Sequence, residues 1–258
     1  MRSKDSETPA DKWLHGSATG RATTGTLPLE GFPTAYRWAP PRPSRAKKAI
    51  PKRGRNHFSV FMVIEDEDGG PGVMSGCGSR DEYHSCLLFL AEPDTLDVIE
   101  QVGPLPYVEN GRAHGHYLDQ LVVKRDGRRL AFSDKPYAHV TPEFENELSQ
   151  VQNAGVARGL FNQLYLVTEY GRDPVALHNA TLIRGCRDRD AEADAQAAEV
   201  VAAMTGPMQL RALAGQIGLG PRGFRALVRM IKPGRLRTVN HERIGLDTIV
   251  ERGAEAES

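Results

Sequence analysis

The chain has 258 residues, of which 26% are charged and 40% hydrophobic, enough for one medium-sized domain and a second, small one. Lysine plus arginine and aspartate plus glutamate each total 33, so the formal net charge is zero, which excludes a nucleic-acid binder that is basic over its whole surface. The three cysteines lack C-x-x-C spacing, which argues against a zinc site and for a reduced, cytoplasmic protein. The sequence shows no apolar leader and no run of about 18 apolar residues, so we expect a soluble protein without membrane contact.

The first 56 residues are rich in Pro, Gly, Ser, Thr and basic residues. Pro40-Pro41-Arg42-Pro43 leads into two basic clusters, at 45–48 and 52–55. Such a composition buries too little apolar surface to fold alone, so the sequence predicts a basic, Pro-rich disordered arm over 1–56. Two roles stay open for this arm, a solvating tail and a clamp on a DNA backbone.

Strand-like and helix-like segments alternate between residues 57 and 190. The expected strands are 57–64, 96–101, 105–108, 117–124, 129–135 and 163–168. The expected helices begin at Ser79, Pro142 and about Pro174. This alternation predicts an α/β domain in which helices flank a mixed sheet.

A polar, alanine- and acid-rich stretch at 188–199 is either a helical linker or a domain boundary. Beyond it, residues 200–250 predict a small helix-turn-helix domain, because 218–220 breaks one helix and Pro221 begins the next at a favoured first position. The segments 235–239 and 244–250 are expected to form a wing.

The second of these helices carries several cations on its outer side and no acids of its own. They are Arg222, Arg225, Arg229 and Lys232. A solvated face and a row of DNA phosphate contacts are both open interpretations.

An isolated acid in an apolar strand is the clearest functional signal. Asp119 would be costly to bury without a partner, and a metal ion or a lysine would supply one. Carboxylates at the mouth of a sheet suit Mg²⁺, a hard cation that prefers oxygen ligands, and a nearby lysine such as Lys135 can orient the attacking water. The order Glu82, Asp119, Lys135 is therefore typical of a metal-dependent nuclease of the PD-(D/E)XK kind.

Each of these residues also has a structural interpretation. Ser79-x-x-Glu82 is a capping box, in which the glutamate reaches back to the cap amide. Lys135 alone is typical of a solvated strand edge. His114 and His116 lie in a Gly-rich segment without a third ligand, so they are expected to be exposed rather than catalytic.

Several segments together resemble the TnsA-like endonuclease subunits of heteromeric transposases, over about residues 57–185. They are Ser79-x-x-Glu82, 96–101 with its Glu100-Gln101 pair, 117–122, 133–136, 165–169 and 177–179. The resemblance implies a restriction-endonuclease-like nuclease domain at 57–190 and a winged-helix-like domain at 200–250. It also implies that Glu82, Asp119 and Lys135 are catalytic, that Glu82 and Asp119 hold Mg²⁺, and that Gln101 belongs to the site.

The implied activity is cutting of the 5′ strands at transposon ends in double-stranded DNA. A DDE-type transposase subunit (TnsB-like) that cuts the 3′ ends is the first implied partner. The second is an AAA+ regulator (TnsC-like), which such proteins engage through the C-terminal domain and tail.

One departure from the family concerns the residue two before the lysine, which is usually Glu or Gln and is Ser133 here. The nearest acid, Asp134, stands one position later than the Glu or Gln of the family. Because strand faces alternate, its side chain should point away from Lys135 unless a bulge turns it. Ser133 and Asp134 are therefore only possible additional site residues.

The predicted strands 117–124 and 129–135 are expected to form a hairpin. The length of its loop determines which residue of the second strand lies opposite Asp119. A three-residue loop at 125–127 with Gly127 left-handed places Asp119 opposite Ser133, whereas a two-residue loop places it opposite Asp134. We expect the three-residue loop, because it alone reproduces the geometry of acid and lysine that the family resemblance implies, with Lys135 on the face of Asp119.

Two alternatives to the transposase nuclease remain: a catalytically degenerate, DNA-bound adaptor of the transposase, and a restriction-type endonuclease. A third, a helix-turn-helix regulator with an unrelated sensor domain, would not explain Asp119 or the Glu100-Gln101 pair.

Overall fold

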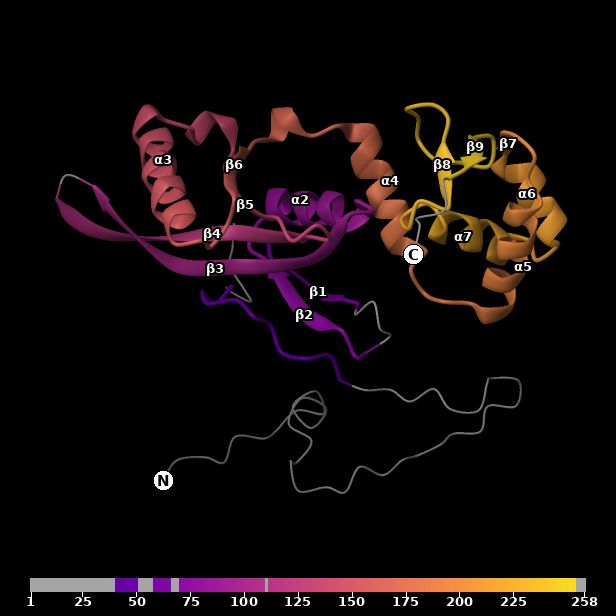
Figure 1. Ribbon diagram of the computed structural model, residues 1–258, viewed down its shortest axis with the longest axis horizontal. Coiled ribbons are helices and arrows are strands. Elements are labelled where there is room, and N and C mark those ends of the chain that lie inside the picture. The colour runs from indigo at the N-terminus through magenta and orange to yellow at the C-terminus, as the bar shows by residue number, and fades with distance from the viewer. Residues whose placement is uncertain (1–39, 51–57, 66–69, 110, 254–258) are drawn as a thin grey trace, which may run out of the picture. The chain divides into compact units, whose positions relative to one another are not determined.

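The computed structural model describes residues 40–50, 58–65, 70–109 and 111–253 (Figure 1). The segment Pro41–Ser258 forms one compact unit. Of the disordered arm predicted over 1–56, the stretches 1–39 and 51–56 lie outside the described residues.

The described part of this arm, residues 40–50, is held against the edge strand of the central sheet. Ser44 Oγ donates to Glu100 Oε1 at 2.6 Å, and the Arg45 guanidinium forms an ion pair with Asp97 at 2.5 Å. The prediction of disorder is therefore wrong for 40–50, because these polar side chains find partners on the sheet. The sequence interpretation had considered only apolar burial.

A mixed four-stranded sheet is the centre of the fold. Its strands, in the order β3-β4-β5-β6, are β3 (Thr95–Glu109), β4 (Arg112–Lys124), β5 (Arg129–Asp134) and β6 (Gln163–Val167). The first three pair antiparallel, and β6 pairs parallel to β5 because a helix connects the two strands. The predicted α/β class with a mixed sheet is confirmed. The two short segments expected at 96–101 and 105–108 belong to the single strand β3.

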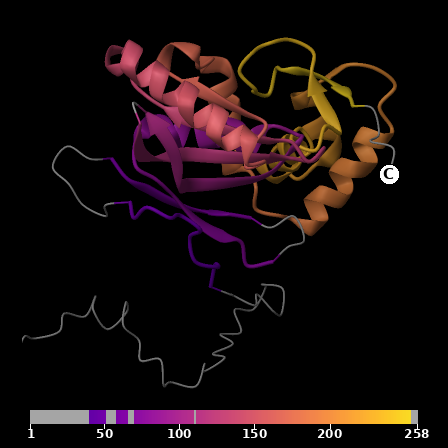
Figure 2. The ribbon, with the colours of Figure 1, turned by 60° about the vertical axis from the view of Figure 1, so that its left-hand side comes forward.

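Two helices cover opposite faces of this sheet, α2 (Arg80–Ala91) and α3 (Pro142–Ala157). Leu121 joins the core under α3, whereas its neighbour Val122 joins the core under α2, as strand alternation requires. Figures 1 and 2 show α3 lying along the sheet. A separate hairpin, β1 (Val60–Ile64) with β2 (Val73–Cys77), adds to the α2 side.

A short 3₁₀ helix, η1 (Tyr137–His139), precedes α3. The elements after β6 are the 3₁₀ helix η2 (Glu169–Gly171), then α4 (Pro174–Gly185), α5 (Ala191–Ala202), α6 (Leu210–Ile217) and α7 (Pro221–Arg229). A small sheet of β7 (Met208–Gln209), β9 (Ile249–Arg252) and β8 (Leu236–Thr238) completes the chain. The turn between α6 and α7 begins at Gly218, whose φ of +74° suits glycine.

The C-terminal elements share a core of their own. Leu210, Leu213, Leu227 and Val250 are fully buried in it. Ala193 and Ala197 of α5 are also fully buried there, so this core begins before residue 200 and α5 is part of it rather than a free linker. Among the described residues, no helix is both long and apolar enough to cross a membrane.

Candidate active site

The hairpin of β4 and β5 has the three-residue loop that the sequence predicted. Lys124 N–H donates to Arg128 O at 2.8 Å, and Gly127 has a φ of +86°. The register runs from Val123 opposite Arg129 to Gln120 opposite Phe132. One further step along the same register places Asp119 opposite Ser133, and Ser133 Oγ donates to Asp119 Oδ2 at 3.4 Å.

Asp134 points to the other face of β5, as alternation predicted. Its Oδ1 accepts from Ser85 Oγ of α2 and from the Arg172 guanidinium, both at 2.6 Å. Lys135 is on the side of α3, with its Nζ 4.5 Å from the centre of the Phe144 ring. The structure therefore places Lys135 on the face of Asp119 and Ser133, but its ammonium lies over the aromatic ring of α3.

Glu82 is both a helix-capping residue and a site residue. Its N–H donates to Ser79 Oγ at 3.0 Å, and its own Oε2 accepts from Gly78 N–H at 2.8 Å, one residue before the cap. The same Oε2 faces Gln101 Nε2 at 3.3 Å. The capping geometry holds the carboxylate rigidly at the start of α2, where it is directed toward the sheet.

Gln101 joins the two carboxylates. Its Nε2 lies 3.3 Å from Glu82 Oε2 and 3.2 Å from Asp119 Oδ1. Among the described residues it is the only one other than glycine with a positive φ, at +46°, a conformation that costs about 1–3 kcal/mol. Its side chain is buried, at 6% exposure. The strained backbone therefore directs the amide between the two acids.

Burial raises the pKa of both carboxyl groups. For Asp119, desolvation is the larger cause and the charge of Glu82 the next, and together they raise the pKa from 3.8 to about 6. Desolvation likewise raises the pKa of Glu82 above its usual value. Two acids with raised pKa values on either side of one amide nitrogen are stabilised as anions by a cation placed between them.

The donor set fits Mg²⁺. The two carboxylates supply the hard oxygen ligands that this ion prefers, and the Gln101 amide turns its nitrogen toward both of them. No group of three or more His, Cys, Asp or Glu in the described part of the chain is arranged to hold a metal ion. A site of two carboxylates suits Mg²⁺, because this ion keeps several waters and is usually held by one or two protein acids.

Arg172 is a site-supporting residue that sequence reasoning missed. Its side chain is 6% exposed, and it bridges the Asp134 carboxylate, which is 1% exposed, to Asp81 of α2. The pairing fixes β5 to the helix that carries Glu82. It lies in the loop after η2, 38 residues from Asp134, and nothing in its local sequence marks it.

His116 is also part of the site, so the prediction that it is exposed is wrong. Its side chain is 10% exposed, and Nδ1 lies 2.9 Å from Glu147 Oε1 of α3. Its Nε2 lies 3.5 Å from Ser133 Oγ. His114 is exposed as predicted and stacks on the Tyr107 ring, 5.3 Å between centroids.

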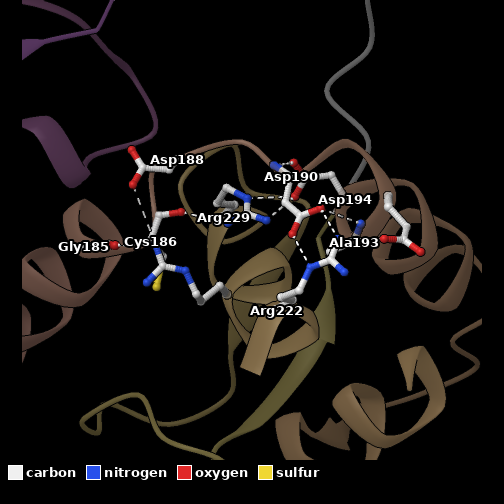
Figure 3. Close-up of polar contacts among 10 residues, drawn as sticks. Gly185, Cys186, Asp188, Asp190, Ala193, Asp194, Arg222 and Arg229 are labelled. Carbon is white, nitrogen blue, oxygen red and sulfur yellow. Dashed lines mark hydrogen bonds and ion pairs between the residues drawn. The ribbon is translucent and has the colours of Figure 1, made fainter. Parts of the chain in front are cut away.

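The arginines of α7 face acids from another part of the chain, which the sequence did not predict (Figure 3). Arg222 forms an ion pair with Asp190 at 2.7 Å, and Arg229 forms one with Asp194 at 2.6 Å. The Arg222 guanidinium holds the pKa of Asp190 well below its usual range. Arg225 donates to the Gly185 carbonyl at 2.9 Å. The acids come from 188–194, part of the stretch predicted to be either a helical linker or a domain boundary.

Lys232 follows the end of α7, three residues after Arg229. It lines a cavity of about 140 Å³ that α2 and α4 also border, together with Arg184 and Arg187. Arg184 and Arg187 both pair with Glu65.

Comparison with models of known protein families gives no match to this chain, and comparison with curated proteins gives none either. The chemistry available to the site follows from its own functional groups. They are two carboxylates that converge on one amide, with a serine, a histidine and a lysine on the adjoining face of the sheet.

Proposed function

We propose that the protein is a Mg²⁺-dependent DNA endonuclease, with Glu82 and Asp119 as the ligands of the cation. The convergence of these two carboxylates on the Gln101 amide carries the proposal. A buried pair of like charges is unfavourable by itself, and a divalent cation in that position would compensate it. The proposed fold of residues 57–190 is restriction-endonuclease-like.

The reaction would be hydrolysis of a phosphodiester by an in-line water. When bound, the cation would polarise a phosphate oxygen and stabilise the charge that develops on it. Gln101 keeps the two carboxylates at a fixed separation. Lys135 is on the correct face to orient the water, provided that its flexible side chain leaves the Phe144 ring.

The proposed biological role is cutting of 5′ strands at transposon ends, beside a DDE-type transposase that cuts the 3′ strands and an AAA+ regulator. The motif resemblance of residues 57–185 supports this role. The competing role, a DNA-bound adaptor that no longer cuts, is favoured by Ser133, because its side chain supplies no carboxylate next to Asp119. A restriction-type enzyme is the third candidate, and a neighbouring methyltransferase gene would favour it.

Cleavage and cation binding test the proposal together. DNA that carries the ends of the element should be cut on the 5′ strands when the partner transposase and Mg²⁺ are present, and chelation of the cation with EDTA should stop the cutting. Calorimetric titration of the protein with Mn²⁺ should show one site, which Glu82→Gln weakens by at least about 10-fold.

The matched control is Glu145→Gln, which removes an exposed acid of α3 away from the site. It should bind Mn²⁺ like the parent. Cleavage that persists in EDTA, or equal Mn²⁺ affinity of the Glu82→Gln variant and the parent, would contradict the proposed metal site.

We propose that the C-terminal domain is winged-helix-like and contacts the AAA+ partner rather than DNA. The ion pairs of Arg222 and Arg229 with acids of 188–194 support this assignment, because an arginine that binds phosphate would first have to leave its carboxylate. These pairs also bind α7 to α5, so their first role is to hold the C-terminal core together.

Replacing Arg222 and Arg229 with alanine is therefore expected to leave the salt dependence of DNA binding unchanged and to lower the unfolding midpoint. A phosphate contact would instead reduce the log–log salt slope by roughly 0.9 for each arginine. Binding to an end-containing duplex, measured by fluorescence anisotropy over a range of salt concentrations, separates the two results. Arg237→Ala, on an exposed position of β8, is the control.

A further inference from the structure

His116 is a site residue to which the proposed function assigns no role so far. It belongs to β4, three residues before Asp119, and its ring lies between α3 and the catalytic face of the sheet. Nδ1 is 2.9 Å from Glu147 Oε1, and Nε2 is 3.5 Å from Ser133 Oγ. The same Ser133 Oγ is 3.4 Å from Asp119 Oδ2. One small side chain therefore separates the imidazole from the proposed metal ligand.

Glu147 determines which ring nitrogen carries the proton. An ionised carboxylate can only accept a hydrogen bond, so Nδ1 is the donor and Nε2 of the neutral ring keeps its lone pair. Glu147 is itself held by a hydrogen bond from the hydroxyl of Tyr107, a residue that is 7% exposed. A carboxylate that fixes the tautomer and the direction of an imidazole is the arrangement that orients a general base.

The other groups on this face cannot take a proton from water while they perform their proposed roles. Lys135 in its charged form only donates. Asp119 and Glu82 would be engaged by the cation. Among the described residues that surround Asp119 on this face, Nε2 of His116 is the acceptor that remains.

We propose that His116, held by Glu147, is the general base for the attacking water, an inference that rests on the nuclease function proposed above. The water oxygen forms the new bond to phosphorus, and the proton of the water passes to Nε2. The bond from phosphorus to the 3′ oxygen breaks with its electron pair, and this oxygen takes a proton from solvent. His116 then returns its proton to solvent, so that atoms and charge balance.

Glu147, His116 and Ser133 also have the order of a serine-nucleophile triad, but the surroundings of Ser133 disfavour that chemistry. Its hydroxyl donates to the Asp119 carboxylate, and the side chain is buried, at 3% exposure. An oxyanion formed on a substrate beside Asp119 would meet a negative charge rather than a hydrogen-bond donor. Covalent labelling of Ser133 by a fluorophosphonate probe would overturn the general-base assignment.

The first test compares single-turnover cleavage rates on saturating end DNA. His116→Asn keeps a donor toward Glu147 but offers no nitrogen lone pair toward Ser133, so it should cut about 10²–10⁴-fold more slowly than the parent. Glu147→Gln should cut roughly 10–100-fold more slowly, because the ring loses the partner that orients it. Affinity for DNA and for Mn²⁺ should stay at the parent values in both variants. Glu145→Gln, exposed on the same helix, should cut like the parent.

A paired exchange tests the role of the base rather than the role of the ring in packing. His116→Ala opens space beside Ser133, and Ser133→Glu places a new carboxylate in that space, so Ser133→Glu should raise the rate of the His116→Ala variant at least about 10-fold more than it raises the rate of the parent, where a gain would come from an added metal ligand. A merely structural His116 would not be replaced by an acid on the neighbouring strand. Failure of the exchange to restore any rate in a folded double variant, as judged by its circular dichroism spectrum, would count against the proposal.

Nitrogen-15 NMR of the histidine ring provides a readout without DNA cleavage. In the neutral form of the ring, Nδ1 of His116 should carry the proton and Nε2 should not. A proton on Nε2, or a His116→Asn variant that cuts at the parent rate, overturns the inference and leaves the proposed metal site intact. A parent that does not cut DNA at all overturns both.

Discussion

Replacing Asp119 with asparagine is expected to abolish Mg²⁺-dependent cutting of the 5′ strands while the protein stays folded. The amide keeps the shape of the side chain and can still accept from Asp134 N–H, which lies 2.8 Å from Asp119 Oδ2. It loses the charge that would hold the cation. Loss of groups that only support a metal ligand costs 10–100-fold, so loss of the ligand itself should cost at least about 100-fold. Quantitative strand-cleavage assays with the partner transposase present measure this rate.

The same substitution is expected to stabilise the protein in the absence of metal. The pKa of Asp119 is raised from 3.8 to about 6 by burial and by the Glu82 charge, so the native state binds the proton more tightly than the unfolded state. The stabilisation by protonated Asp119 is present below pH 3.8 and is lost as the pH rises through about 6. At 1.36 kcal/mol per unit of pKa shift, the cost of ionising Asp119 in the folded protein approaches roughly 3 kcal/mol at neutral pH.

The measurement is urea unfolding of the parent and the Asp119→Asn variant from pH 4 to 8 without divalent cations. The free energy of unfolding of the parent should fall relative to the variant across this window, and added Mn²⁺ should stabilise the parent alone. A variant that is less stable than the parent at pH 7, or one that cuts as fast, would show that Asp119 is an ordinary structural acid.

Replacing Arg172 with methionine is expected to cost about 3–5 kcal/mol of stability, because it leaves a buried carboxylate without its cation. The Asp134 side chain is 1% exposed and the Arg172 side chain 6%, so water cannot take the place of the lost guanidinium. Cutting should also fall, since the pair fixes β5 to the helix that carries Glu82. Asp134→Asn in the Arg172→Met background should recover part of the stability, because the uncompensated charge is then removed.

Arg211→Met is the matched control for this substitution. Arg211 pairs with Asp247 at 2.9 Å, but the two side chains are 58% and 76% exposed, and such surface pairs contribute about 0–1 kcal/mol. Urea unfolding of both variants tests whether burial decides the cost. Equal losses in the two variants, or a small loss for Arg172→Met, would remove the structural role assigned to the buried pair.

Several parts of the site can be predicted from the sequence because they depend on local rules. The Asp126-Gly127 turn fixes the loop length, the loop length fixes the register, and the register places Asp119 opposite Ser133 and turns Asp134 to the other face. The cap at Ser79 and the turn at Gly218 follow from equally local chemistry. The alternation of apolar segments was also sufficient for the α/β class of the main domain.

The pairing of the charged groups depends on how the elements pack and cannot be predicted from the sequence. Glu147 reaches His116 across 31 residues, and Arg172 reaches Asp134 across 38. The arginines of α7 face the acids of 188–194 although the two stretches are far apart in the chain. A basic side chain can pair with almost any carboxylate, so the local sequence around it does not specify its partner. The packing of α2 and α3 on opposite faces of the sheet, and of α5 on α7, selects the partners, and with them the residues that can hold a cation or accept a proton.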